Sequence, residues 1–261
     1  MTSASMTQTQ PPVVLDLDAS VGALPGEVRL PLKDAWQERL RFGCGLRTLA
    51  SFREVLDAAL PAFGDHGTVF MGSGDFHHLS WPLVERCIAA GAFSAAQPLH
   101  VLVLDNHPDN MRFPFGVHCG SWVRRVALLP QVAHVDVVGI TSPDIGTGHA
   151  WENYLAPLRA GKLTYWSTGV DTGWARWLGL GGRMRSFPDV DALVEAVMGM
   201  LNRQRLPTYL SIDKDAFSPR VVRTNWDQGL LEARHVAALL TLLRGRLVGS
   251  GCGRRFHRQR F

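Results

Sequence analysis

The stretch Leu102-Val-Leu-Asp-Asn-His-Pro-Asp109 decides how the rest of this sequence is interpreted. Residues 99–104 are almost uninterrupted Leu and Val, which is typical of a strand buried on both faces of a parallel sheet. In extended backbone alternate side chains point the same way, so we expect Asp105, His107 and Asp109 to project together. Two oxygen donors and one nitrogen donor form a set of metal ligands, although Asp and Asn also commonly form turns after strands.

A second stretch, Thr208-Tyr-Leu-Ser-Ile-Asp-Lys-Asp215, repeats this design, because an apolar segment again ends in Asp213 and Asp215. Open parallel sheets place their sites at the carboxyl ends of strands, so the two clusters are expected to meet. Four carboxylates brought together would repel one another unless divalent cations compensated their charge. The second strand therefore strengthens the prediction of a metal site.

Histidines follow a third short apolar segment, Thr68-Val-Phe-Met-Gly-Ser-Gly-Asp-Phe-His-His-Leu-Ser80. Here a Gly-rich turn leads into His77 and His78, and imidazole is a common nitrogen ligand for such ions. The combined order is His, then Asp-x-His-x-Asp, then Asp-x-Asp. In residue type, order and strand context it resembles the ureohydrolase family of arginase, agmatinase and formimidoylglutamase, whose signatures are Gly-Gly-Asp-His, Asp-x-His-x-Asp and Ser-x-Asp-x-Asp.

The resemblance implies two manganese ions (Mn²⁺) and assigns a role to each matched residue. Asp105 and Asp213 would bridge the ions, and His107 and Asp215 would complete one of them. Asp109 and a histidine would complete the other. A Phe separates the Gly-Asp pair from the histidines, so either His77 or His78 is the ligand, with His77 favoured as the first of the two.

The loop Gly116-Val-His-Cys-Gly120 is similar to a family loop that carries a His-Gly pair. This similarity implies that His118 is a proton shuttle; the alternative is an ordinary polar loop histidine. The adjacent Cys119 suggests a thiol nucleophile, but the carboxylate clusters already account for this region. The four cysteines are scattered without a C-x-x-C pair, which favours reduced thiols.

The alternation of apolar strand-like and amphipathic helix-like segments predicts an α/β fold, a three-layer α/β/α arrangement around a mostly parallel sheet, as in arginase. We expect one domain over residues 13–249, a disordered leader over 1–12 and a basic tail over 250–261. Helices are expected at 51–63, 81–92, 122–129, 190–201 and 230–243, and a further strand at 135–140. Residues 141–182, rich in Gly and Trp, are expected to form a long loop that is either a wall of the substrate pocket or a packed surface subdomain.

Composition excludes several other classes of protein. The formal net charge is +4, but four arginines (Arg254, Arg255, Arg258 and Arg260) lie in the last eight residues, which leaves the body neutral. No nucleic-acid motif accompanies them, so we expect no nucleic-acid partner. No run approaches the roughly 20 apolar residues of a membrane span, and the first dozen residues lack a signal-peptide pattern, so a cytoplasmic location is expected.

The expected activity is hydrolysis of a carbon–nitrogen bond in a small cationic guanidino or amidino compound. Two manganese ions would lower the pKa of a shared water, Asp109 or Asp215 would accept a hydrogen bond from the resulting hydroxide, and His118 would protonate the leaving amine. Manganese suits an oxygen-rich site better than zinc does. Homo-oligomers are a family habit and are kept as an expectation.

Substrate recognition is the weakest part of the resemblance. Arginase-like proteins supply a glutamate after their last strand, whereas no acidic residue follows Glu232 here. Asp227, in the segment 224–229, is an alternative carboxylate for a cationic substrate, or an ordinary turn residue. Two other functions stay open: a deacetylase of related fold that acts on an amide, and a catalytically silent binding or structural protein.

Overall fold

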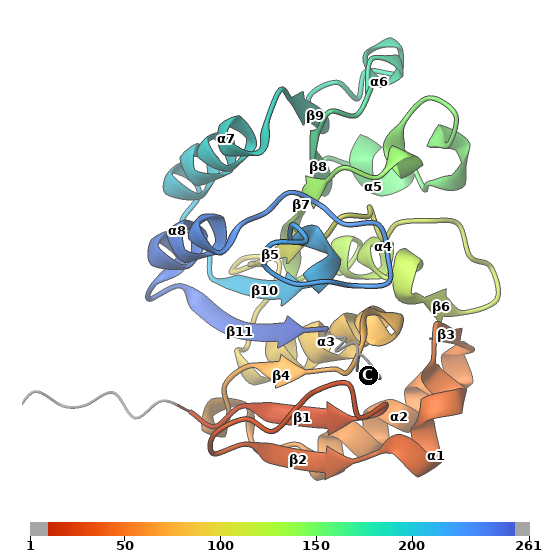
Figure 1. Cartoon of the computed structure of the whole chain (residues 1–261), viewed down its shortest axis with the longest axis vertical. Coiled ribbons are helices and arrows are strands. Elements are labelled where there is room, and N and C mark those ends of the chain that lie inside the picture. Colours follow the sequence, from red (N-terminus) through yellow and green to blue (C-terminus); the bar gives the residue numbers. More distant parts are fainter. Residues whose placement is uncertain (1–9, 254–261) are drawn as a thin grey trace, which may run out of the picture.

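A computed structural model describes residues 10–253. Its centre is a sheet of nine strands whose cross-strand pairs are all parallel (Figure 1). The strands occur in the order β2-β1-β4-β11-β10-β5-β7-β8-β9. Their bounds are β1 Val13–Asp16, β2 Val28–Pro31, β4 Val69–Phe70, β5 Leu99–Leu104, β7 Val132–Ile140, β8 Leu163–Thr168, β9 Met184–Phe187, β10 Thr208–Ile212 and β11 Leu247–Cys252. A separate antiparallel pair joins β3 (Gly43–Cys44) to β6 (Val117–His118).

Helices cover both faces of the sheet and give the predicted three layers. Within β5, Val101 and Val103 pack in the hydrophobic core of one face, whereas Leu102 and Leu104 pack in the core of the other, so this strand is buried on both sides. The first face carries α1 (Lys33–Leu40), α2 (Leu46–Ala59), α3 (Ser80–Ala90), α4 (Val123–Ala127), α5 (Ala156–Arg159) and α6 (Trp174–Trp177), and the second carries α7 (Val190–Arg203) and α8 (Ala233–Leu243).

The prediction of a long loop over residues 141–182 is wrong, because this segment contains α5, β8 and α6. All six residues of β8 are buried, but three of them are Ser or Thr, so the strand lacks an aliphatic pattern. Hydrogen bonds satisfy two of these hydroxyls: Ser167 Oγ donates to the Arg185 carbonyl at 3.1 Å, and Thr164 Oγ1 lies 2.9 Å from His134 Nε2. Hydroxyls that form hydrogen bonds can be buried at little free-energy cost. A buried strand that contains them is therefore not recognised from its hydropathy.

The chain also differs from prediction near both ends. β11 continues to Cys252 between β4 and β10, so the domain extends past residue 249, where the tail was expected to begin. At the other end the carbonyls of Pro11 and Pro12 accept backbone hydrogen bonds from Gly67 and Val28, so they are part of the fold and not of a leader. The remainder of the predicted leader (1–9) and of the basic tail (254–261) lies outside the described residues. Between residues 10 and 253, no helix combines the length and hydropathy that crossing a membrane requires.

One buried charged network joins the middle strands away from their ends. Asp136 accepts hydrogen bonds from His100 Nε2 at 2.9 Å and Trp166 Nε1 at 2.7 Å, and His134 Nε2 lies 3.5 Å from it. Burial alone would raise the pKa of Asp136, but the hydrogen bonds from the two histidines outweigh burial and lower it. The network therefore holds β5, β7 and β8 together through one carboxylate.

Candidate metal centre

Two adjacent strands of the sheet end level with each other, which brings their polar residues together. Ile212 pairs with Leu104, and the next residue continues the ladder because Asp213 N donates to the Leu104 carbonyl at 2.8 Å. Asp105 N likewise donates to the Val138 carbonyl of β7 at 3.0 Å. Both carboxylates therefore leave the sheet at its carboxyl edge, as predicted for a parallel sheet.

The chain after β5 does not stay extended, although extension was predicted from the alternation of Asp105, His107 and Asp109. These side chains come together because the backbone bends. Residues 105–110 form bends rather than a strand, and Asp109 lies in the left-handed region with φ 46°. Asp is among the few residues that tolerate this conformation. Such backbone strain clusters at functional sites, and here it turns the Asp109 side chain back toward Asp105.

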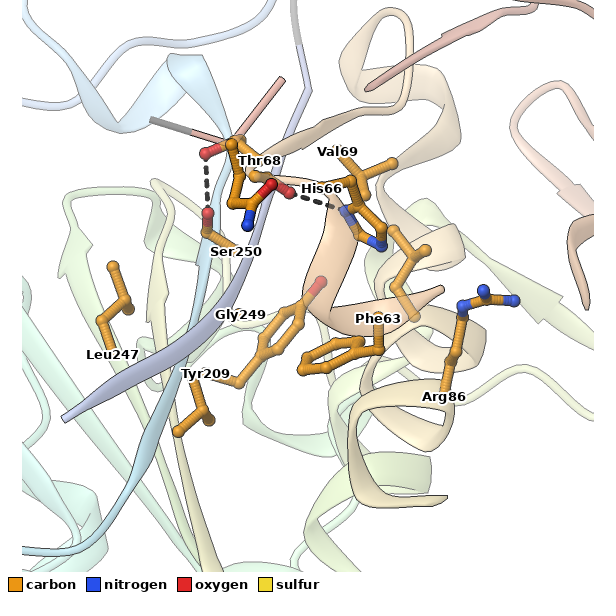
Figure 2. A pocket seen from close by; sticks show the side chains of 13 residues that line it. Phe63, His66, Thr68, Val69, Arg86, Tyr209, Leu247, Gly249 and Ser250 are labelled. Carbon is orange, nitrogen blue, oxygen red and sulfur yellow. Dashed lines mark hydrogen bonds between the residues drawn. The ribbon is translucent and has the colours of Figure 1, made fainter. Parts of the chain in front are cut away.

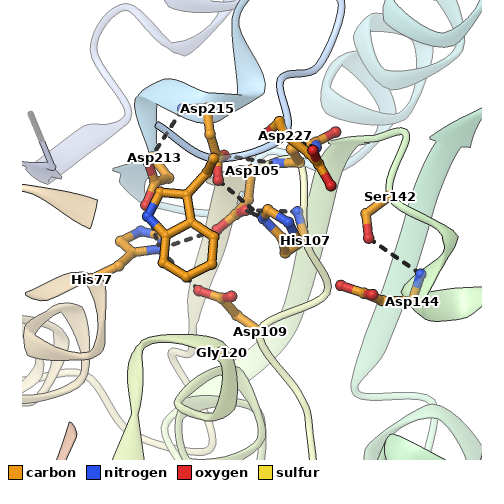
Figure 3. Close-up of polar contacts among 12 residues, drawn as sticks. His77, Asp105, His107, Asp109, Gly120, Ser142, Asp144, Asp213, Asp215 and Asp227 are labelled. Carbon is orange, nitrogen blue, oxygen red and sulfur yellow. Dashed lines mark hydrogen bonds and ion pairs between the residues drawn. The ribbon is translucent and has the colours of Figure 1, made fainter. Parts of the chain in front are cut away.

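The first group of potential ligands is His77, Asp105 and Asp109, whose donor atoms lie within 4.8 Å of one another (Figure 3). His77 Nδ1 lies 2.9 Å from Asp109 Oδ2 and 3.0 Å from Asp105 Oδ2. This Asp105 oxygen is buried but accepts no hydrogen bond of good geometry from residues 10–253. Burial of a carboxylate oxygen favours a cation beside it.

The second group is Asp105, His107 and Asp215, within the same 4.8 Å limit. His107 Nδ1 lies 3.0 Å from Asp215 Oδ2 and 3.7 Å from Asp105 Oδ1. Asp105 belongs to both groups, which is the position that a bridging carboxylate occupies. The other carboxylate assigned as bridging, Asp213, lies beside the first group, with its Oδ2 3.6 Å from His77 Nδ1.

Burial and charge perturb the pKa values of the whole cluster. Burial would lower the pKa of His77, but its carboxylate neighbours raise it well above the usual value, and in the same way the pKa of His107 rises to about 12. Burial and the charge of Asp105 raise the pKa of Asp109 to about 7, and burial with neighbouring carboxylates raises that of Asp215. Protons thus compensate the carboxylates in the metal-free protein, and binding of a cation would release them.

The two adjacent histidines have different environments. Both lie on the short helix Gly74–Leu79 that follows β4, where successive side chains point about a third of a turn apart. His77 therefore faces the carboxylates, whereas both ring nitrogens of His78 are buried without a hydrogen-bond partner among residues 10–253. Burial lowers the pKa of His78 to about 3. The geometry brings His77 and not His78 into the cluster.

His118 lies on β6, which pairs with β3. Its Nδ1 accepts a hydrogen bond from the Gly120 amide at 3.0 Å, so in the neutral ring the proton is on Nε2. Burial lowers the pKa of His118, which favours this neutral form. The ring is outside both ligand groups.

Several residues that the sequence did not single out orient the ligands. Trp122 Nε1 donates to Asp109 Oδ2 at 2.6 Å, and Ser211 Oγ lies 2.9 Å from His77 Nε2. Gly74 is also required, because a Cβ atom there would lie 2.8 Å from Asp213 Oδ2. Ser211 lies two residues before Asp213 in the sequence, so its position could have predicted its contact with the site. Trp122 is far from the three motifs in the sequence, so no pattern predicts its contact.

Two further carboxylates flank the cluster. The Asp227 carbonyl accepts a hydrogen bond from Asn106 Nδ2 at 3.0 Å, which fastens the 224–229 segment beside the metal ligands, and the Trp226 ring lies edge-on to His107. Figure 3 shows Asp144 pointing toward the side that holds His107. Asp144 lies on the short helix Pro143–Ile145 after the buried strand β7, not directly at the strand end, so the rule that revealed Asp105 does not reach it.

No protein-family model and no curated protein matches this sequence. Solved structures do match its fold. A hypothetical agmatinase from Burkholderia thailandensis aligns with 95% of this chain and 78% of its own length, at 14% identity and a TM-score of 0.51. Formimidoylglutamase from Bacillus subtilis aligns with 98% of this chain and 82% of its own, at 9% identity and a TM-score of 0.51.

A formiminoglutamase from Trypanosoma cruzi aligns with 80% of this chain, at 16% identity and a TM-score of 0.49, and this chain spans only 62% of that protein's length. The two longer alignments, with TM-scores of 0.51, confirm the predicted arginase-like α/β fold.

Proposed function

We propose that this chain is a two-metal hydrolase that cleaves a carbon–nitrogen bond in a small guanidino or amidino compound. The observation that carries the proposal is the sharing of Asp105 between two ligand groups at the carboxyl edge of an arginase-like sheet. Carboxylate-rich donor sets with one imidazole per ion suit manganese. The buried Oδ2 of Asp105, which accepts no hydrogen bond of good geometry within residues 10–253, supports the fit.

The two groups support most of the ligand assignment. His77 and Asp109 would hold one ion, His107 and Asp215 the other, and Asp105 would serve both; the second bridging role, of Asp213, is carried over from the ureohydrolase resemblance. Two manganese ions at these ligands would supply hydroxide near neutral pH. Through the indole of Trp122, the protein keeps the Asp109 carboxylate in a fixed orientation.

The remaining chemistry belongs to the residues of this chain. Asp109 or Asp215 would accept a hydrogen bond from the attacking water and so direct its lone pair at the electrophilic carbon. In the neutral ring the Gly120 amide donates to Nδ1 and the proton is on Nε2. To act as the shuttle, His118 would first take up at Nδ1 the proton lost by the attacking water, with release of the Gly120 hydrogen bond, and the imidazolium would then pass its Nε2 proton to the leaving amine and return to the neutral form. Asp144 and Asp227 would attract the positive charge of the substrate in place of the glutamate that the last strand lacks.

The proposal is tested by a turnover screen on protein loaded with manganese. Guanidino and amidino compounds are assayed for release of urea or ammonia, and N-acetylated amines for release of acetate. The proposal expects turnover in the first set, lost in Asp105→Asn. It also expects His118→Ala to retain both ions but turn over about 10² to 10⁴ times more slowly.

Each other outcome selects a different function. Acetate release alone would select the deacetylase. Two bound ions without turnover of any compound would select the silent binding protein.

A further inference from the structure

A cavity of about 270 Å³ lies near the amino ends of the central strands, whereas the candidate metal ligands follow their carboxyl ends (Figure 2). Tyr209 and Leu247, at the beginnings of β10 and β11, line it together with Val69 of β4. Asp213 follows the other end of β10, so the full length of this strand separates the cavity from the metal cluster. The proposed hydrolysis makes no use of this space.

Three buried polar atoms of residues that line the cavity have no hydrogen-bond partner within residues 10–253. They are the hydroxyl oxygen of Tyr209, Nε2 of His66 and Nε of Arg86. His66 Nδ1 lies 2.8 Å from the Gly67 carbonyl, which can only accept, so Nδ1 carries the proton and Nε2 of the neutral ring has a lone pair. The wall therefore presents one acceptor, and the Tyr209 hydroxyl is free to donate. A ligand that pairs with these groups would remove the unfavourable free energy of leaving them unpaired.

The charge in the wall is already compensated. Arg86 donates through Nη1 to Asp57 at 3.1 Å and through Nη2 to the Pro61 carbonyl at 2.7 Å, which ties α3 to the end of α2. Only its Nε lacks a partner in the described part of the chain. Because Asp57 balances the guanidinium, the cavity favours a neutral ligand over an anion.

The remaining wall combines apolar side chains with Gln10 and with the hydroxyls of Thr68 and Ser250, which bond to each other at 2.7 Å. A glycine shapes its aromatic part. A Cβ atom on Gly249 would lie 3.0 Å from the Tyr209 ring and 3.1 Å from the Phe63 ring. A glycine in the middle of a central strand weakens the strand and often marks a close approach. Here it leaves room for two aromatic rings, and Figure 2 shows them beside each other beneath His66.

We propose that this cavity binds a small neutral aromatic compound that bears an amide group. The amide N–H would donate to His66 Nε2, its carbonyl oxygen would accept from the Tyr209 hydroxyl, and the ring would pack against Phe63. The site has its own residues, so the inference holds whether or not the proposed hydrolase activity is correct.

Benzamide is the probe for this site, and its binding to the full chain is measured by titration calorimetry and by NMR. One saturable site per chain is expected. Tyr209→Phe removes only the hydroxyl and should weaken binding about 3- to 10-fold, as should His66→Phe. The matched control Tyr154→Phe removes a hydroxyl that is not in this cavity and should bind as the wild type does.

Three further measurements keep the inference falsifiable. Thermal unfolding of each variant shows that a loss of binding is not a loss of fold. Asp213→Ala, which disables the metal centre, should leave benzamide binding unchanged. Benzoate, an anion of the same shape, should bind more weakly.

The inference is overturned if wild-type protein shows no saturable binding up to the solubility limit of benzamide, which would mean that water alone fills the cavity. It is also overturned if Tyr209→Phe binds as tightly as the wild type, or if benzoate binds as well as benzamide.

Discussion

Replacing His77 and His78 one at a time by Leu separates a metal ligand from a buried neighbour. Both side chains lie on the same short helix and are almost fully buried, with 1% and 0% of their surfaces exposed. The substitution therefore changes size and hydrophobicity almost equally at the two positions. What differs is the contacts, since only His77 touches the carboxylates.

The contacts set the expected magnitudes. In metal-free protein the protonated His77 lies 2.9, 3.0 and 3.6 Å from the carboxylates of Asp109, Asp105 and Asp213. Removing the cationic partner of buried carboxylates should lower the free energy of unfolding by about 3 to 5 kcal/mol. His78→Leu removes two unpaired nitrogens, each of which costs roughly 1 to 3 kcal/mol, so this variant should be at least as stable as wild type.

Urea unfolding followed by tryptophan fluorescence, with a chelator present, measures both free energies. Equilibrium dialysis against manganese with elemental analysis then counts the ions. We expect at most one ion in His77→Leu and two in His78→Leu. Equal destabilisation of the two variants, or loss of manganese from His78→Leu alone, would refute the ligand assignment.

Four further predictions follow from other parts of the structure. Asp136→Asn should lower the free energy of unfolding by about 3 to 5 kcal/mol at neutral pH. Because its folded pKa is lowered, Asp136 contributes stability above an unfolded pKa of about 4 that is lost as the pH falls further, so urea titrations should show a steeper acid loss in wild type than in the variant; parallel losses would contradict this. Trp122→Phe should weaken manganese binding about 10- to 100-fold in a chelator competition, and an unchanged affinity would remove its orienting role. A chain that stops after Gly253 should keep both ions and the urea midpoint of the full chain. A chain that stops after Gly249 loses the end of a central strand and should unfold at a lower urea concentration; equal midpoints for the two chains would contradict this prediction. Asp213→Ala should release both ions, and two ions retained on dialysis would show that it does not bridge.

The sequence revealed strands that are aliphatic and ligands that directly follow them. Leu99–Leu104 is such a strand, and Asp105 and Asp213 are such candidate ligands, so the sheet edge and the carboxylates gathered there were predictable together. The choice between His77 and His78 was not predictable, because it depends on the direction of each side chain on the short helix Gly74–Leu79. Sequence spacing alone does not give that direction.

Other parts escaped prediction for physical reasons. The buried strand Leu163–Thr168 carries hydroxyls whose partners lie on neighbouring strands, so its burial depends on tertiary hydrogen bonds. The end of β11 contains two glycines and reads as a turn, yet Gly249 and Gly251 are the residues that make room for Tyr209. Trp122 reaches Asp109 from another element, and no local pattern encodes that contact.

The most direct test of the central claim is anomalous diffraction at the manganese edge from crystals of the manganese-loaded protein. The account predicts two peaks, one within reach of His77, Asp105 and Asp109 and the other within reach of Asp105, His107 and Asp215. Absence of any peak at these ligands under excess manganese, with the carboxylates still clustered, would contradict it.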